Sequence, residues 1–513
     1  MTFEGLNEMS SQTLPTTTAA PPENAPSHLA ADEPSWARTI GLLGMMLTVL
    51  GLTVVTFNEI YGPRIVSKAW GLAFIALGVT ATLFHAVRDR DPQIRRAYAI
   101  IGYGLIGLMA IISLVNSRNF LSYGWACALT ALCLFLSSCR HETDPVPRRR
   151  LLATLGILGV IMVAGGLIGG LTSPGFLLTY GLILTLLGLL YLCAFINQCE
   201  PLSDVGHKAG LAIGAVAVFV ILYAVLRSVV PSLMKSQPAA FLVPNGLLLM
   251  FIGLVYGLVS LGIVSDWKLV VLTRRELGGF FFSPVAYIVM LSMALLGWVA
   301  YWIFISVLHL SKGLYEPIVL YYYQLFSPIV VIFVVPAITM RLLAEEKRTG
   351  TYEVLMCAPV KESTVVLSKF IAGLIFYMLL WAIWALFLIA LRVESGTEFD
   401  YRPLLSFYLA LALSGAGFIS MGLFFSSLSK NQIIAAVLTF IGMWVIFLGG
   451  RFFQGFEAVG PMWRSVFKHL SYSDVWDAAL HGQVHLREII LQGSFTFFWL
   501  FLTMKVLEAR RWS

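Results

Sequence analysis

Apolar runs of about 20 residues recur along almost the whole chain, and each is long enough to cross a bilayer as a helix. With 58% hydrophobic and only 12% charged residues, the chain lacks the polar surface that a water-soluble globule needs. These two observations predict an all-α, polytopic membrane protein.

We expect about 14 transmembrane helices of this length. Those before residue 266 are expected near 39–57, 69–87, 97–115, 121–139, 151–171, 175–196, 209–230 and 241–265. Those after it are expected near 284–309, 318–340, 364–391, 404–427, 432–450 and 486–507. An even number of spans places both termini on the same side of the membrane.

Residues 1–36 are rich in Ser, Thr, Pro and Ala, which predicts a disordered tail. No basic stretch leads from this tail into an apolar run, so the pattern is not that of a cleaved signal peptide. Placing the N-terminus in the cytoplasm puts most Lys and Arg of the loops inside. We therefore expect an inner-membrane protein with both termini cytoplasmic. Basic loops facing anionic membrane lipid explain the +7 net charge without nucleic acid.

A short charged segment, 341–359, separates the apolar runs 318–340 and 364–391. Most of its residues favour helix until Gly350 interrupts them and Pro359 stops them. Its charged residues are Arg341, Glu345, Glu346, Lys347, Arg348 and Glu353. Because a turn between two spans needs few polar residues, the segment is interpreted as a docking surface for a soluble partner. The charges alone also fit an ordinary cytoplasmic turn.

Two further segments are amphipathic. Residues 266–282 interleave apolar side chains with charged ones before Pro284 turns the chain into the membrane, which predicts a helix along the cytoplasmic interface. The residues that define this segment are Trp267, Arg274, Arg275, Glu276 and Pro284. Residues 451–485 carry many aromatic side chains, and a re-entrant or surface helix is expected there on the outer side.

Several of these stretches resemble the ABC type-2 permeases. They are Arg274-Arg-Glu-Leu277, Phe282-Ser-Pro-Val-Ala-Tyr287 and Pro336-Ala-Ile-Thr-Met-Arg-Leu-Leu-Ala-Glu-Glu-Lys-Arg-Thr-Gly-Thr-Tyr-Glu-Val-Leu355. Gly482-Gln-Val-His-Leu-Arg-Glu488 and Arg510-Arg-Trp512 are similar to the gliding-motility-associated branch of that family. The resemblance covers residues 266–513, and residues 37–265 form a separate eight-helix bundle outside it.

The resemblance implies a six-helix bundle with an interfacial elbow helix at 267–282. It also implies a cytoplasmic coupling helix within 341–359 that binds a separate ATP-binding subunit. Members work as pairs, so a homodimer or heterodimer of permeases is expected. The implied function is that of the membrane-spanning permease subunit of an ABC transporter, an exporter in our interpretation.

Catalytic chemistry is not expected in this chain. It has no Gly-x-x-x-x-Gly-Lys-Ser/Thr sequence to hold phosphates, so the partner would bind ATP and magnesium. No catalytic residue, cofactor or metal site is predicted. His481 and His485 have the spacing of two zinc ligands, but no glutamate lies between them as in the HExxH motif.

Two other functions remain open. An ion-coupled secondary transporter usually keeps ionisable groups inside its bundle. The expected spans are almost free of them, and Lys369 is interpreted as reaching back to the cytoplasmic interface. Alternatively, the chain could serve as a membrane scaffold or anchoring subunit of a cell-envelope assembly, a role that the short loops of residues 37–265 would suit.

Overall fold

The computed structural model describes most of the chain beyond residue 34. The described ranges are 35–61, 67–88, 91–115, 120–142, 144–172, 176–199, 204–233, 245–310, 318–324, 326–351, 360–395, 400–455 and 472–511. The predicted tail lies almost wholly outside these ranges, so its disorder stays a prediction. Every regular element in the described ranges is a helix.

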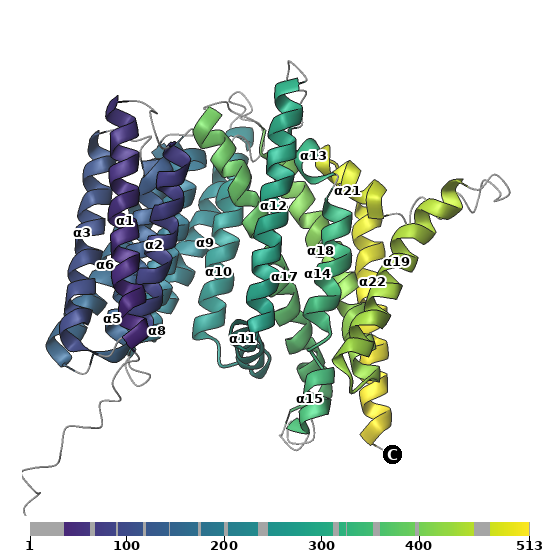
Figure 1. The fold of residues 1–513 in the computed structure, drawn as a ribbon. Helices are drawn as coiled ribbons and strands as arrows, with labels where there is room; N and C mark the ends of the chain where they lie inside the picture. The colour runs from purple at the N-terminus through teal and green to yellow at the C-terminus, as the bar shows by residue number, and fades with distance from the viewer. Residues whose placement is uncertain are drawn as a thin grey trace, which may run out of the picture. The chain divides into compact units, whose positions relative to one another are not determined.

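The helices follow the apolar runs closely (Figure 1). In the first half they are α1 (Ser35–Tyr61), α2 (Lys68–Arg88), α3 (Pro92–Val115), the π-helix η1 (Phe120–Gly124), α5 (Trp125–His141), α6 (Pro145–Thr172), the π-helix η2 (Leu177–Gly181), α8 (Leu182–Gln198), α9 (Asp204–Leu233) and α10 (Gly246–Val264). In the second half they are α11 (Lys268–Phe281), α12 (Pro284–Leu310), α13 (Ile318–Tyr323), α14 (Ser327–Thr339), α15 (Ala344–Thr349), α17 (Glu362–Ser395), α18 (Arg402–Leu428), α19 (Gln432–Gly455), α21 (Tyr472–Leu480) and α22 (Leu486–Arg511).

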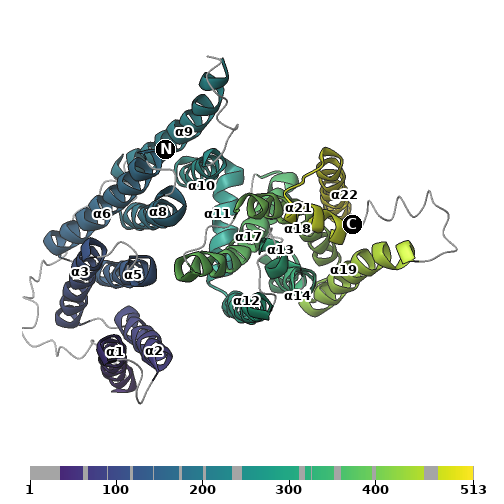
Figure 2. The ribbon, with the colours of Figure 1, turned by 90° about the horizontal axis from the view of Figure 1, so that it is seen from above.

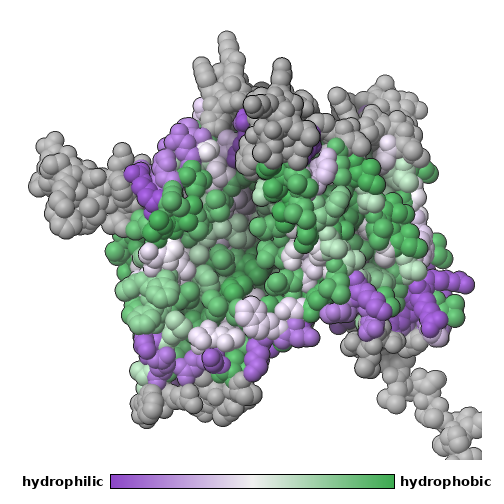
Figure 3. All heavy atoms as spheres, turned by 180° about the vertical axis from the view of Figure 1, so that it is seen from behind, coloured by the Kyte–Doolittle hydropathy of each residue, from purple (hydrophilic) through white to green (hydrophobic). Residues whose placement is uncertain are grey.

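Within the described ranges, the structure supports eleven of the 14 expected transmembrane helices. Eleven helices are long and apolar enough to cross a membrane, and three shorter apolar helices occupy Thr39–Val55, Trp125–Arg140 and Gln432–Phe447. Each of the 14 expected apolar runs corresponds to one of these eleven long helices or three shorter helices. Seen from the side, green hydrophobic residues cover the middle of the helices and purple hydrophilic residues gather toward their ends (Figure 3). The protein is therefore an all-helical, polytopic membrane protein.

The chain forms two compact units, one of residues 1–108 with 126–151 and the other of residues 109–125 with 152–513. In the first, α1 and α2 approach closely through glycines. A Cβ on Gly44 would meet the Gly78 carbonyl oxygen at 2.8 Å, and one on Gly51 would meet that of Gly71 at 2.6 Å. Small residues that face each other across two helices allow such backbone contact in a membrane.

The second unit has two cores. One joins α6, η2, α8, α9 and α10, and Tyr401, just before α18, packs against it. Within this core the hydroxyl of Tyr256 donates to the Thr185 carbonyl oxygen at 2.7 Å. The glycine run at 165–170 allows close packing, since a Cβ on Gly166 would lie 2.9 Å from the Gly181 carbonyl oxygen.

The other core lies in the C-terminal bundle and is formed wholly by residues after 266, from α12 to α22. Aromatic side chains fill much of it, with Tyr323 in contact with Trp381, Trp384 and Phe407. The indole nitrogen of Trp384 donates to the Met293 carbonyl oxygen at 3.0 Å, so this buried polar group is satisfied. Viewed from above, α14, α17, α18 and α22 surround this core (Figure 2).

The second span of this bundle differs from the single helix expected at 318–340. It divides into α13 and α14, separated by a turn around Gln324 and Phe326. The hydroxyl of Ser327 donates to the Tyr323 carbonyl oxygen at 2.7 Å across this turn. Hydropathy alone did not predict the break, because apolar residues lie on both sides of it.

Candidate functional site: the coupling segment

The charged segment after α14 forms a short helix, α15, at one end of the C-terminal bundle. Its entry is held by α18, because Ser426 Oγ accepts hydrogen bonds from the backbone N–H groups of Leu343 (3.1 Å) and Ala344 (3.0 Å). These N–H groups have no partner inside the helix. The helix ends at Gly350, whose φ of 76° is a left-handed conformation that glycine adopts without strain. The serine and the glycine thus fix both ends of α15.

The charges predicted in this segment divide between internal contacts and solvent. Arg341 pairs with Glu345 through two hydrogen bonds, of 2.6 and 2.9 Å. Lys347 is buried and its ammonium group donates to the Ser427 carbonyl oxygen of α18. Arg348 is exposed. Only part of the charge is therefore available to a partner.

Lys369, in the second turn of α17, connects three helices. Its ammonium nitrogen lies 2.8 Å from a carboxylate oxygen of Glu276 on α11 and 2.7 Å from one of Glu346 on α15. The Lys369 side chain is 1% exposed. Two carboxylates from other helices therefore meet Lys369 inside the protein, and that it reaches back to the membrane interface stays a prediction. We call Lys369, Glu276 and Glu346 the Lys369 cluster.

Burial makes this cluster sensitive to change. Ions that leave water lose hydration, and only close partners with good geometry offset that loss. Two short, charge-assisted bonds supply such partners for Lys369. The second carboxylate oxygen of Glu346 is buried and makes no hydrogen bond. A displacement of α15 that left α11 and α17 in place would break one of the two buried ion pairs of Lys369, so the three helices are linked electrostatically.

The predicted elbow helix is α11, which lies crosswise at the lower ends of its neighbours, at the end of the bundle that also carries α15 (Figure 1). Trp267 precedes it and is 69% exposed. Arg274 reaches back to the Gly262 carbonyl oxygen at 3.3 Å, and Arg275 contacts Glu276 at 3.2 Å. Pro284 is the first residue of α12, a position where proline costs no hydrogen bond.

The exposed end of α15 consists of Arg348, Thr349, Gly350 and Thr351. We call these four residues the α15 tip. Glu353 and Pro359, the remaining predicted partner-binding residues, lie outside the described residues. Sequence reasoning missed Ser426 and the ion pairs of Lys369, although Lys369 is the one charged residue in the apolar run 364–391.

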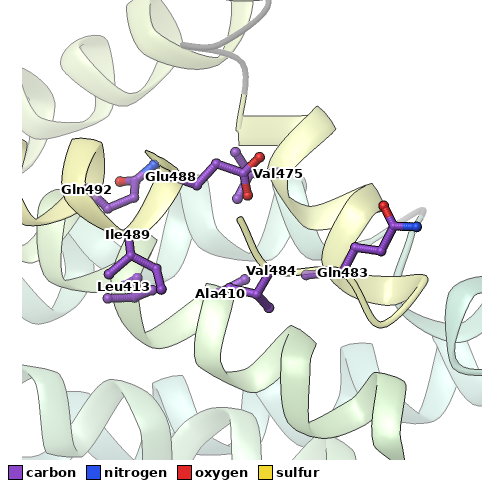
Figure 4. Close-up of a pocket in the computed structure, with 9 residues that line it drawn as sticks. Ala410, Leu413, Val475, Gln483, Val484, Glu488, Ile489 and Gln492 are labelled. Atoms are coloured by element: carbon purple, nitrogen blue, oxygen red, sulfur yellow. The ribbon is translucent and has the colours of Figure 1, made fainter. Parts of the chain in front are cut away.

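The opposite end of the bundle has a shallow hollow between α18, α21 and α22, with room for about one water molecule (Figure 4). Its lining combines apolar side chains with a few polar ones: Ala410, Leu413, Val475, Ala479, Gln483, Val484, Glu488, Ile489 and Gln492. Of the predicted outer segment 451–485, the structure describes the end of α19 up to Gly455, the helix α21 and the turn after it. His481 contacts its own helix through the Asp477 carbonyl oxygen at 2.8 Å. No group of three or more potential metal ligands occurs among the described residues.

Comparison with known proteins gives a family match for the region that contains α15. Residues 305–503 match the model of the ABC-2 family transporter proteins. This part of the chain is similar to ABC-2 transporter membrane domains. The match runs from α12 into α22 and includes α15 and Lys369, whereas α11 lies before it. No curated protein and no solved structure gives a significant match to the chain. The resemblance to ABC-2 permeases is thus supported for 305–503, and the gliding-motility branch stays a prediction.

Proposed function

We propose that this protein is the membrane-spanning permease subunit of an ABC transporter, driven by a separate ATP-binding subunit that docks on the α15 tip. The observation that carries the proposal is the Lys369 cluster. It links the docking helix to the elbow helix and to a long transmembrane helix, within a region similar to ABC-2 transporters. A cytoplasmic turn without a partner has no need of such a link.

In this proposal, ATP-driven closure of the partner displaces α15. The Lys369 cluster then carries α11 and α17 with it as a rigid body, while Ser426 transmits the movement to α18. The aromatic core between α13, α17 and α18 lies further along the same helices. Movement at one end of the bundle therefore changes packing toward the other.

We further propose that the protein is an exporter of the inner membrane, acts as a pair of permeases and has both termini in the cytoplasm. In the second unit, α15 and the end of α22 lie at the same end of the bundle (Figure 1), which supports a shared side for these segments. The largely apolar bundle favours a hydrophobic or amphipathic cargo.

Co-purification with the ATP-binding subunit tests the docking site. Arg348→Glu reverses an exposed charge of the α15 tip, where complementary charges fix the orientation of a partner. We expect Arg348→Glu to lower the amount of ATP-binding subunit retained by about tenfold, at unchanged membrane insertion. The same reversal at Lys208, an exposed residue of α9, is the matched control. Equal retention by wild type and Arg348→Glu would place the docking surface elsewhere.

A further inference from the structure

Arg95, near the start of α3 in the first unit, is a buried cation with incomplete hydrogen bonding. Arg95 as a whole is only 7% exposed. The guanidinium Nε and Nη1 atoms are buried and have no hydrogen-bond partner. No ion pair joins Arg95 to any carboxylate in the described part of the chain. Because a buried, unpaired charge is strongly unfavourable, the site calls for an anion.

The surroundings of Arg95 are held in place by polar contacts between three helices. Ser138 Oγ on α5 donates to the Arg95 carbonyl oxygen at 3.2 Å, and Ser137 Oγ donates to the Ala86 carbonyl oxygen of α2. On α3, the Tyr98 hydroxyl lies 2.7 Å from Nδ1 of His85 on α2. Arg95 lies one helical turn before Tyr98, on the same face of α3. The backbone that carries the unpaired guanidinium is therefore fixed.

The acidic groups in the segments that adjoin α3 and α5 make other contacts. Asp91 accepts a hydrogen bond from the Gln93 backbone N–H at 2.9 Å, and Glu142 accepts one from that of Asp144 at 3.4 Å. Asp144 also pairs with Arg96 at 3.5 Å. These carboxylates could have neutralised Arg95, but none lies within 4.0 Å of it.

The composition around this site favours phosphate over other anions. In the sequence, residues 85–96 and 140–150 contain only arginine as their strong base, at positions 88, 90, 95, 96, 140, 148, 149 and 150. Asp89, Asp91, Glu142 and Asp144 oppose them, which leaves an excess of positive charge. The planar guanidinium group binds phosphate oxygens in a bidentate manner that lysine cannot match.

We propose that Arg95 binds the phosphate group of an anionic phospholipid at the cytoplasmic end of α2, α3 and α5. Lipid is the favoured source because Arg95 lies in the first turn of an apolar span, Gln93–Ile111, and the end of such a span is where lipid headgroups are expected. Basic pockets between transmembrane helices on the cytoplasmic side recognise such headgroups. The proposal concerns the first unit and is independent of the transport function proposed for the second.

Native mass spectrometry of the purified full chain tests the site by comparing phosphatidylglycerol with phosphatidylcholine. Wild type should bind phosphatidylglycerol preferentially, and Arg95→Met should weaken that binding about tenfold or more, as expected for charge-assisted hydrogen bonds. Arg95→Lys should fall between them, because it keeps the charge but loses the bidentate geometry. The matched control is Arg96→Gln, whose side chain is 62% exposed in wild type, and it should bind within about threefold of wild type.

Thermal denaturation distinguishes lipid binding from a structural role. In lipid-free detergent, Arg95→Met should unfold at a temperature no lower than wild type, because it removes a buried charge without a partner. Phosphatidylglycerol should raise the midpoint of wild type and leave that of Arg95→Met unchanged. If inorganic phosphate raises the thermal midpoint of wild type as much as phosphatidylglycerol does, the site binds free phosphate. If only the lipid raises the midpoint, the site binds the lipid headgroup. Undiminished lipid preference in Arg95→Met, or no preference in wild type, would overturn the proposal.

Discussion

At the scale of single residues, Lys369 is the position where the chemistry of the candidate site is concentrated. Its ammonium group is shared by two carboxylates, 93 and 23 residues away in sequence. The sequence shows an isolated lysine in an apolar run, but it cannot show which distant carboxylates fold against it. Arg341, Glu345 and Glu346 were identified from sequence because local charge density is visible there. Their distribution between internal pairs and solvent depends on the tertiary fold.

Removing the lysine alone should destabilise the protein. Lys369→Met would leave Glu276 and Glu346 without the buried cation that they share, and breaking a buried pair in this way costs about 3–5 kcal/mol. Purified Lys369→Met should therefore lose its folded form at a clearly lower temperature than wild type, as measured by size-exclusion chromatography after heating.

A charge-neutral variant separates stability from coupling. Replacing Glu276 and Glu346 by Gln together with Lys369→Met removes all three charges, so much of the stability should return. The triple variant should then stimulate the ATPase activity of the ATP-binding subunit less than the wild-type permease does. If the triple variant were as unstable as Lys369→Met, loss of packing rather than stranded charge would be the cause.

At the scale of helices, the positions of all the membrane spans were predictable, since an apolar run long enough to cross a bilayer is visible in composition alone. The break between α13 and α14 and the close approach of α18 to α14 were not. Both depend on side chains that meet across helices. Gly422 on α18 is the clearest case, because a Cβ there would lie 2.3 Å from Oγ1 of Thr339 at the end of α14.

Gly422→Ala should therefore push α14, which leads into α15, away from α18, which caps α15 through Ser426. Overpacking of this kind costs about 1–3 kcal/mol, and the thermal midpoint should fall. Gly493→Ala on α22 is the control, because nothing lies within 4 Å of its Cβ position and alanine favours helix over glycine. Thr339→Ala in the same chain should restore part of the loss by removing Oγ1. Equal midpoints for Gly422→Ala and Gly493→Ala would show that α14 and α18 separate without cost.

At the scale of the whole molecule, the predicted orientation can be tested directly. The positive-inside rule places the turn before α17 in the cytoplasm and the turn after α21 outside. Ser363 and Gln483 are exposed at these two turns. In a chain lacking its six native cysteines, Gln483→Cys should react with a membrane-impermeant thiol reagent added to intact cells. Ser363→Cys should react only after the membrane is opened. The reverse labelling pattern would show that the protein has the opposite orientation in the membrane.

The independence of residues 266–513 is the remaining question at this scale. The two compact units do not divide there, since residues 152–265 belong to the same unit as the C-terminal bundle. The buried cores nevertheless separate near that point. Every described residue of the C-terminal core lies after 266. Among the described residues, Tyr401 alone joins the core of α6 to α10 from beyond that point. A bundle whose own core is complete needs little from its neighbours to fold.

We therefore predict that residues 262–513, expressed without the first half, insert into the membrane and bind the ATP-binding subunit. The fragment keeps α11 and thus the whole Lys369 cluster, so its ATPase activity with the partner should match that of the full chain within about threefold. Loss of the contacts of Tyr401 should cost at most about 2–3 kcal/mol, the value of one large apolar side chain. Co-purification and ATPase assays of the fragment provide the measurement. A fragment that is degraded, but recovers when residues 1–265 are co-expressed, would show that the two halves fold as one.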